Sequence, residues 1–371
     1  MNFIKTSRFL WLISLLFLIA CGSNQENILE YNKAENKMFY YQGRNDILKD
    51  STVALISPGS YVASSFSGNF CEVFLKAEFK PYNYVSFELD GKYLGRIKIE
   101  SDSIRPYLIK VPKTNQPHTI KIFKESEASN GAVLFGGLKA AKMLPYKLTT
   151  EKYIEFIGNS ITCGAAADGS VTPCDSGSYF DHQNVYDAYG PSVSRALNTN
   201  FMLSSVSGIG IYRNWNDENI EEPIISQVYE NLYLDTNNSI KFSFENTPDI
   251  VSICLGTNDL SEGDGIKTRL PFNKEKYIAN YIDFVKTVYS HYPTTQIVLL
   301  SSPMSGKEGN EILMNCLKEI QTYFAEGTQK PILLFEFDAS YNGGCSWHPS
   351  VEEHQQIANK LIPYFEGILL N

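Results

Sequence analysis

The sequence predicts two folded domains of different class, an all-β sandwich followed by an α/β domain built on a parallel sheet. Between residues 37 and 147 the chain carries short runs of alternating, β-branched and aromatic residues, as in the strands of a sandwich. From residue 148 to residue 371, apolar runs of strand length alternate with helical patterns, which is typical of right-handed parallel units. A chain of 371 residues is long enough for both domains.

Six segments of the first domain have the composition of strands. They are residues 52–56, 72–75, 84–89, 96–99, 107–111 and 118–122. Asp90 and Gly91 stand between the third and fourth segments. This pair is a strong hairpin signal, because a type I′ turn needs a positive φ at both central residues.

The second domain has four runs that are apolar enough for strands covered on both faces. They are residues 154–157, 250–255, 296–300 and 332–337. Helices are predicted over residues 274–291 and 310–324. The last helix has the clearest start, because Ser350 and Glu353 have the spacing of a capping box. That box would also hold the loop in which His348 stands.

The N-terminus has the pattern of an export signal. Lys5 and Arg8 precede the apolar run 9–19, which is too short for a comfortable membrane span. The run ends at Ala20 and Cys21, and this ending resembles the cleavage motif of bacterial lipoproteins.

We therefore expect residues 1–20 to be a lipoprotein signal peptide, Cys21 to be the lipidated residue, and residues 21–36 to be a polar tether. The protein would then be exported and anchored by lipid in a bacterial envelope, at the periplasmic face or the cell surface. A soluble secretory signal and an uncleaved anchor are the alternatives.

Four short polar blocks are candidates for an acyl-transfer site. Ser160 lies at the turn that ends the run 154–157, where a strand can present a serine hydroxyl at the top of a parallel sheet. Gly208, Asn258 and His348 lie in the three later blocks. A histidine could reach the serine there, and N–H groups could face a developing oxyanion.

In this order, the four blocks resemble those of the SGNH hydrolases, also called GDSL-like esterases. The segment 208–214, the preceding β-rich domain and the ending Trp347-His348-Pro349 make the chain most similar to carbohydrate esterase family 2, which deacetylates plant polysaccharides. The resemblance implies a jelly-roll sandwich domain over residues 37–147. It also implies an SGNH-type parallel-sheet α/β/α hydrolase domain over residues 148–371.

The same resemblance implies the role of each block. Ser160 would be the nucleophile and His348 the general base. The oxyanion hole would be formed by the N–H groups of Ser160 and Gly208 and by the side-chain amide of Asn258. Asn159 stands where the wider superfamily usually has Asp, a departure that should leave the hydroxyl chemistry intact.

A second departure concerns the group that orients His348. The superfamily usually has an Asp three residues before the histidine, and this chain has Cys345 there. A backbone carbonyl can hold the required tautomer in place of a carboxylate, although it stabilises an imidazolium less well. We expect such a Ser-His dyad, which is also similar to the family named above. Asp338 and Glu336 are alternative third members.

Three aromatic residues near the proposed site could bind a sugar ring by stacking or could simply pack in the core. They are Tyr212, Trp215 and Trp347.

We expect a carbohydrate O-acetyl esterase that removes acetyl groups from a polysaccharide or oligosaccharide through an acyl-Ser160 intermediate. A glycan-binding lipoprotein without catalysis and a lipase or phospholipase of the GDSL type are the alternatives.

Composition limits the other partners. The formal net charge is −9 and no basic stripe is present, which argues against nucleic acid as a partner. No Cys-x-x-Cys or His-x-x-x-His pairing occurs, so we expect no metal and no cofactor. Cys163, Cys174 and Cys345 flank the proposed site loops, and the sequence leaves open whether two of them form a disulfide.

Overall fold

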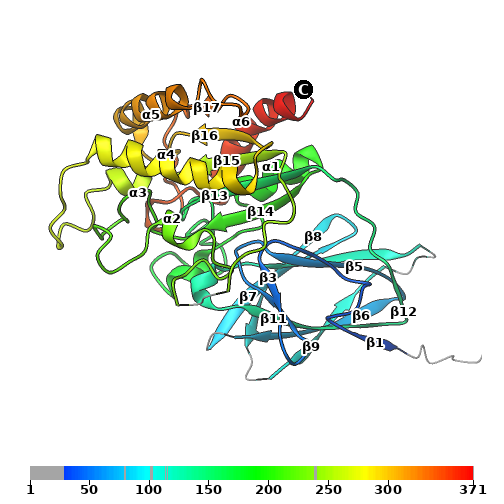
Figure 1. Cartoon of the computed structure of the whole chain (residues 1–371). Helices are drawn as coiled ribbons and strands as arrows, with labels where there is room; N and C mark the ends of the chain where they lie inside the picture. Colours follow the sequence, from blue (N-terminus) through cyan, green and yellow to red (C-terminus); the bar gives the residue numbers. More distant parts are fainter. Residues whose placement is uncertain are drawn as a thin grey trace, which may run out of the picture.

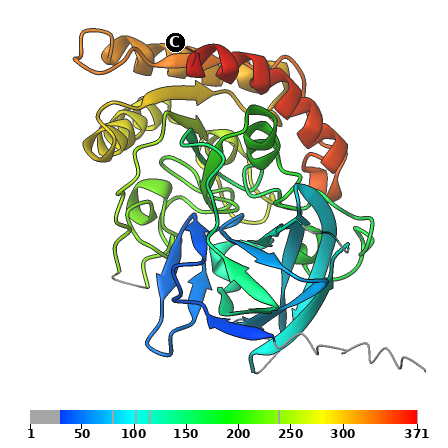
Figure 2. The same ribbon diagram turned by 90° about the vertical axis from the view of Figure 1, so that its right-hand side faces the viewer.

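The structure, a computed structural model, describes residues 29–78, 81–100, 103–112, 114, 116–237 and 240–370. It consists of a β domain, formed by strands between residues 30 and 144, and an α/β domain between residues 153 and 370 (Figure 1, Figure 2). The predicted signal peptide and the predicted lipidation site at Cys21 lie outside the described residues.

The β domain is a sandwich of two antiparallel sheets. The first has the strand order β3-β4-β11-β6-β9, with β1 pairing to β11, and the second has the order β12-β5-β10-β7-β8, with β2 pairing to β5. The strands are β1 (Glu30–Lys33), β2 (Tyr40–Gln42), β3 (Asn45–Ile47), β4 (Val53–Leu55), β5 (Tyr61–Ser67), β6 (Phe70–Ala77), β7 (Tyr82–Leu89), β8 (Lys92–Glu100), β9 (Arg105–Lys110), β10 (His118–Lys124), β11 (Val133–Ala140) and β12 (Lys142–Leu144).

Alternation along the strands explains the packing of the sandwich. In β6 every second residue is buried, so that Cys71, Val73 and Leu75 face the core between the sheets. The predicted hairpin between β7 and β8 is confirmed, with φ of 52° at Asp90 and 77° at Gly91.

The predicted tether over residues 21–36 is wrong at its C-terminal end. Strand β1 pairs antiparallel with β11, with Glu30 opposite Ala140 and Lys33 opposite Gly137. The hydroxyl of Tyr31 also donates to the Gly136 carbonyl at 2.8 Å. A strand at a sheet edge is held by its main chain, so the polar side chains that suggested a tether do not prevent its formation.

The α/β domain is built on a five-stranded parallel sheet with the order β14-β13-β15-β16-β17. Its strands are β13 (Tyr153–Gly158), β14 (Asn200–Ser205), β15 (Ile250–Cys254), β16 (Gln296–Leu300) and β17 (Leu333–Phe335). The helices are α1 (Tyr189–Leu197), α2 (Ile225–Val228), α3 (Thr257–Leu260), α4 (Lys274–His291), α5 (Gly306–Tyr323) and α6 (Val351–Leu369), and the 3₁₀ turns are η1 (Ala128–Asn130), η2 (Tyr179–His182) and η3 (Cys345–Trp347).

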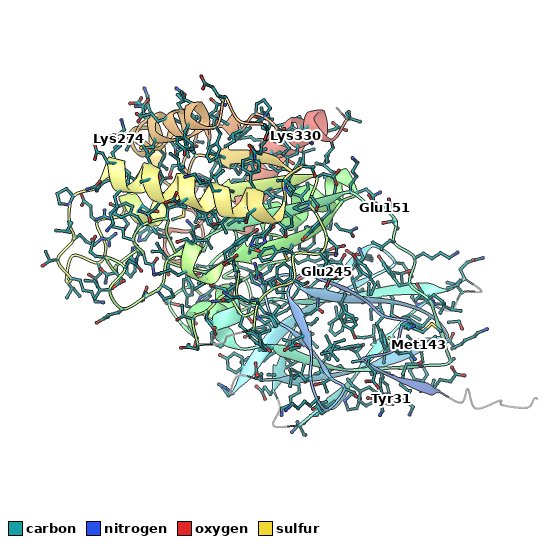
Figure 3. All side chains as sticks on the ribbon, viewed as in Figure 1. Tyr31, Met143, Glu151, Glu245, Lys274 and Lys330 are labelled. Atoms are coloured by element: carbon teal, nitrogen blue, oxygen red, sulfur yellow. A yellow bond between two sulfur atoms is a disulfide. The ribbon has the colours of Figure 1, made fainter. Side chains whose placement is uncertain are left out.

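Helices cover both faces of this sheet, because successive strand residues point to opposite sides. In β16, for example, Ile297 and Leu299 face α4 and α5, whereas Val298 and Leu300 face α1 and α6. Figure 3 shows side chains filling the interior of both domains. The predicted architecture, a parallel-sheet α/β domain preceded by a β-sandwich, is confirmed.

The strand order places the site. The chain runs from β13 to β14 on one side and then to β15 on the other, so the order reverses between β13 and β15. Ligands of open α/β sheets bind outside the carboxyl ends of the strands at such a point. Ser160 follows β13 and Asn258 follows β15, which puts both at this edge.

The two domains share a core. Tyr61 and Phe123 of the β domain pack against Phe201 of the α/β domain. The fully buried Arg44 crosses the interface, and its guanidinium donates to the hydroxyl of Ser204 at 3.1 Å and to the carbonyl of Asn231 at 2.8 Å. These contacts join the domains into one unit. Over the described part of the chain, no helix combines the length and the apolar character needed to span a bilayer.

Candidate active site

Ser160 and His348 are in hydrogen-bond contact although they lie 188 residues apart in the sequence. The hydroxyl oxygen of Ser160 is 2.9 Å from Nε2 of His348. Ser160 is 7% exposed, so its side chain is nearly buried at the edge of the sheet where the parallel strands end. This distance is the one required between a nucleophile and its base.

The turn that carries Ser160 is fixed by its neighbours. The side chain of Asn159 accepts the N–H of Ile161, and the carbonyl of Ser160 accepts the N–H of Ala165. At Gly158 a Cβ atom would collide with the side chain of Thr162, so the strand can enter this turn only with glycine. The Asn159 that replaces the usual Asp therefore supports the turn through its amide oxygen.

His348 is oriented by a main-chain carbonyl. Its Nδ1 is 2.9 Å from the carbonyl oxygen of Ser346. Because a carbonyl can only accept, Nδ1 carries the hydrogen and Nε2 presents its lone pair to Ser160. Burial lowers the pKa of His348, and the bond to Ser346 opposes that shift.

The turn before His348 has an unusual backbone. Ser346 and Trp347 have φ of 50° and 60°, which lie in the left-handed region. Cys345 forms a disulfide with Cys174, and its N–H donates to the carbonyl of Ala166 at 2.7 Å. Cys345, which stands in place of the expected Asp, thus fixes the turn in which the Ser346 carbonyl points toward the imidazole.

Neither alternative third member bonds to the imidazole. Within the described ranges, the hydrogen bonds of the His348 ring go to Ser160, Ser346 and Tyr179. Asp338 instead pairs with Lys360 at 2.7 Å. The geometry is that of a Ser-His dyad.

The three predicted oxyanion donors line the same cleft as the dyad. Gly208 has a φ of 76°, and its carbonyl accepts the N–H of Trp215 at 2.8 Å. Asn258 uses one amide hydrogen on the carbonyl of Ile209, at 2.8 Å. In the part of the chain that the structure describes, the N–H groups of Ser160 and Gly208 have no protein acceptor. These donors can therefore face a substrate oxygen.

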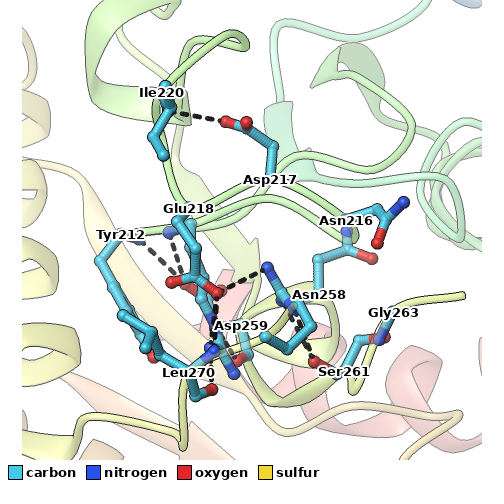
Figure 4. Close-up of polar contacts among 12 residues, drawn as sticks. Tyr212, Asn216, Asp217, Glu218, Ile220, Asn258, Asp259, Ser261, Gly263 and Leu270 are labelled. Atoms are coloured by element: carbon cyan, nitrogen blue, oxygen red, sulfur yellow. Dashed lines mark hydrogen bonds and ion pairs between the residues drawn. The ribbon is translucent and has the colours of Figure 1, made fainter. Parts of the chain in front are cut away.

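Asp259, next to Asn258, fixes the segment that follows Gly208. Its buried carboxylate accepts the N–H of Ile211 at 3.0 Å. It also accepts the N–H of Tyr212 at 2.9 Å (Figure 4). Burial raises the pKa of Asp259 to about 6, against the opposing effect of these bonds. The signal in the sequence is a carboxylate directly after an apolar strand, but its partners lie about fifty residues away in the chain, so their identity was not predicted.

The cleft has a volume of about 820 Å³ and is lined by the site residues and by two tryptophans. Trp215 is 47% exposed and Trp347 is 78% exposed, and both line the cleft, as expected for rings that bind a sugar. The prediction for Tyr212 is wrong. Its ring is buried against Phe272, and its hydroxyl accepts the N–H of Asn273.

Tyr179 is a cleft residue that the sequence analysis missed. Its hydroxyl is 3.3 Å from Nε2 of His348. Tyr179 begins η2, whose Asp181 carboxylate accepts the hydroxyls of Tyr82 and Tyr84 from the β domain. The position of Tyr179 depends on contacts between the domains and on the disulfide, so no local pattern marks it.

Among the described residues, no three His, Cys, Asp or Glu side chains are grouped so that they could hold a metal ion. The chemistry available in the cleft is that of a hydroxyl, an imidazole and a set of N–H donors. Together with the parallel sheet, these groups have the arrangement found in serine hydrolases of the SGNH type.

Comparison with known proteins agrees with a serine hydrolase of the SGNH type. Residues 41–146 match the family "Carbohydrate esterase 2 N-terminal". The chain is 27% identical over 321 residues to an "Acetylxylan esterase / glucomannan deacetylase" of Cellvibrio japonicus, and the match covers 81% of this chain and 86% of that protein. It is 28% identical over 345 residues to "Cellulase/esterase CelE" of Acetivibrio thermocellus, where the match covers 88% of this chain and 39% of that longer protein.

A solved structure is similar as well. A family two carbohydrate esterase from Clostridium thermocellum, in complex with cellohexaose, is 25% identical, with a TM-score of 0.79 over 89% of this chain and 99% of that chain. The prediction from the sequence, an SGNH-type hydrolase most similar to carbohydrate esterase family 2, is confirmed.

Proposed function

We propose that this protein is a carbohydrate O-acetyl esterase that works through an acetyl-Ser160 intermediate. The observation that carries the proposal is the 2.9 Å contact between the Ser160 hydroxyl and Nε2 of His348, at a cleft that also holds Gly208 and Asn258. A hydroxyl becomes a nucleophile when a neighbouring base takes its proton.

The geometry supports a two-step reaction. The Ser160 oxygen attacks the acetyl carbonyl as its proton moves to Nε2 of His348, and the carbonyl oxygen becomes an oxyanion facing the N–H groups of Ser160 and Gly208 and the amide of Asn258. The bond to the sugar oxygen then breaks, and this oxygen takes the proton from His348. Water activated by His348 attacks acetyl-Ser160 in the second step, which releases acetate and restores the serine.

The substrate class follows from the relatives and from the cleft. A relative is named an acetylxylan esterase and glucomannan deacetylase, and a similar structure was solved with cellohexaose. In this chain Trp215 and Trp347 present exposed rings on the cleft. Flat aromatic rings can pack on the apolar faces of sugars, which favours an acetylated polysaccharide or its oligomers over a small free ester.

The test is acetate release from acetylated xylan, glucomannan, pectin and peptidoglycan fragments, measured for the wild type and for Ser160→Ala in parallel. We expect release from at least one polysaccharide and its loss in Ser160→Ala. If no acetylated sugar is hydrolysed, the glycan-binding alternative replaces this proposal. A series of p-nitrophenyl esters tests the lipase alternative, because rates that rise with acyl length would contradict an acetyl site.

The cellular location is part of the proposal. The N-terminal pattern supports an exported protein anchored to a bacterial envelope membrane through lipid on Cys21. Cys21→Ser should then move the full-length protein from the membrane fraction to the soluble fraction of cells. A variant that stays in the membrane fraction would contradict the anchor.

A further inference from the structure

Glu127, a residue of the β domain, lies next to the segment that carries the proposed oxyanion donor Gly208. We propose that Glu127 is a positioning residue for this donor, so that the β domain takes part in catalysis by holding the oxyanion hole in shape. The inference rests on the proposed function, because it concerns the same reaction, and it assigns a role to a domain whose sequence did not suggest one.

Both carboxylate oxygens of Glu127 are bonded to the residue that precedes Gly208. One oxygen accepts the N–H of Ser207 at 2.6 Å, and the other accepts the hydroxyl of Ser207 at 2.5 Å. Glu127 is 3% exposed, so water cannot easily replace either bond. Charge-assisted bonds of this length are about twice as strong as neutral ones.

The segment needs such support because Gly208 is conformationally free. Its φ of 76° is one of several conformations open to glycine, and a rotation of the peptide between Ser207 and Gly208 would swing the donor N–H out of the cleft. The C-terminal side of the turn is held by Asn258, which binds the Ile209 carbonyl, and by Trp215, which binds the Gly208 carbonyl. Glu127 fixes the N-terminal side of the turn by accepting the two bonds from Ser207.

Glu127 is itself fixed inside the β domain. Its main-chain carbonyl accepts the ammonium of the buried Lys124 at 2.6 Å, and the same ammonium donates to the carbonyl and hydroxyl of Ser126. The amide of Gln183 donates to the Glu127 carboxylate at 3.2 Å. The carboxylate is therefore part of a rigid network rather than a loose surface contact.

The role must be one of geometry rather than of charge. A negative carboxylate close to a developing oxyanion would oppose it, so Glu127 can help only by setting where the N–H of Gly208 points. Glutamine has the same shape, and its amide oxygen can accept the N–H of Ser207. The new amide nitrogen takes the place of the oxygen that now accepts Nε2 of Gln183. The Gln183 amide therefore has to turn over, so that its Oε1, which has no partner in the described structure, accepts the new amide hydrogen.

The experiment compares Glu127→Ala, Glu127→Gln and a matched control, with kcat and KM measured on p-nitrophenyl acetate and on the best acetylated polysaccharide. The control is Glu125→Ala. Glu125 is buried two residues away and also accepts an N–H across the interface, from Val185 at 2.6 Å. Among the described residues, its hydrogen bonds go to Ser86, Val185 and Tyr186 and not to Ser207.

We expect Glu127→Ala to lower kcat at least about tenfold with little change in KM, below the 10²–10³-fold cost of losing one oxyanion donor entirely. The rate of inactivation by an organophosphonate, which forms a tetrahedral adduct on serine, should fall in parallel. Glu127→Gln should recover most of both rates. Glu125→Ala should lower the melting temperature without lowering kcat.

Equal kcat losses in Glu127→Ala and Glu125→Ala, or a full kcat in Glu127→Ala, would overturn the inference. If the Glu127→Ala variant does not fold, Glu127→Asp takes its place, because it withdraws the carboxylate by one methylene and keeps the charge. An unchanged kcat in Glu127→Asp would also overturn the inference. The proposed function fails by a different result, namely a wild type that releases no acetate from any sugar or a Ser160→Ala variant that still does.

Discussion

Replacing Asn258 by alanine separates the catalytic use of its amide from the structural one. One amide hydrogen is bonded to the Ile209 carbonyl at 2.8 Å. The other has no protein acceptor among the described residues, so it can face an oxyanion in the cleft. Losing a donor to the oxyanion costs about 10²–10³ in kcat, or about 2.7–4 kcal/mol of transition-state stabilisation. Losing the bond to the buried Ile209 carbonyl costs about 1–3 kcal/mol of folding stability.

We therefore expect Asn258→Ala to lower kcat by about 10²–10³ on p-nitrophenyl acetate, to leave KM nearly unchanged, and to unfold at a lower urea concentration. Steady-state kinetics and urea unfolding monitored by circular dichroism measure the two effects separately. The difference between them is informative, because a purely structural asparagine would change only the second.

Asn200 provides the matched control. Its side-chain amide donates to the Thr150 carbonyl at 2.9 Å, at the opposite edge of the parallel sheet from the cleft. Asn200→Ala should lose stability to a similar degree and keep the wild-type kcat. The reasoning would be refuted if Asn258→Ala kept kcat within about tenfold of the wild type, or if both variants lost kcat equally.

Three further predictions concern the dyad. Burial lowers the pKa of His348, and only the neutral form of this residue can take the Ser160 proton. We therefore expect kcat/KM to be full above that pKa and to fall as the pH drops through it, with a midpoint below about 6.5. A midpoint above that value would contradict the assignment of His348 as the base. Cys174→Ser should lower kcat by up to about 10²-fold, because the turn that carries the Ser346 carbonyl loses its anchor, and dithiothreitol should slow the wild type but have no further effect on this variant. Asp338→Asn should keep the wild-type kcat in the same assay, whereas a loss near the 10⁴-fold seen for a true triad acid would restore a triad.

The elements that the sequence predicted well are those whose side chains face two different environments. The helix over Lys274–His291 was predicted with the observed bounds, because Tyr277, Tyr281, Val285 and Val288 recur at helical spacing and all are buried. The start of α6 was predicted from Ser350 and Glu353, which form the capping box in the structure.

The strands that were missed lack such a pattern. Strand β5 contains small polar residues, and β11 contains two consecutive glycines, Gly136 and Gly137, at a bulge. Glycine and serine have low strand propensity, so the pairing of these strands depends on their neighbours rather than on their own composition. Strand β1 was missed for a similar reason.

Four residues of the site could be predicted because each follows a strand or precedes a capped helix. Ser160, Gly208, Asn258 and His348 meet because the carboxyl ends of parallel strands share one edge of the sheet. The sequence could not predict Tyr179 or Glu127, whose positions depend on contacts between domains. Nor could it choose among the cysteines, since the bridge joins residues 171 positions apart.

The error at Tyr212 has a different cause. Proximity in sequence to Gly208 says nothing of the direction of a side chain. The bonds from the Asp259 carboxylate to successive N–H groups turn this ring into the core rather than toward the cleft.

The central claim is that Ser160, activated by His348, forms the covalent intermediate. A fluorophosphonate ester forms a stable adduct with an activated serine, and peptide mass spectrometry identifies the modified residue. We predict that the adduct maps to Ser160, that one equivalent abolishes acetate release, and that His348→Ala reacts far more slowly. An adduct on another residue, or acetate release that persists in fully labelled protein, would contradict the account.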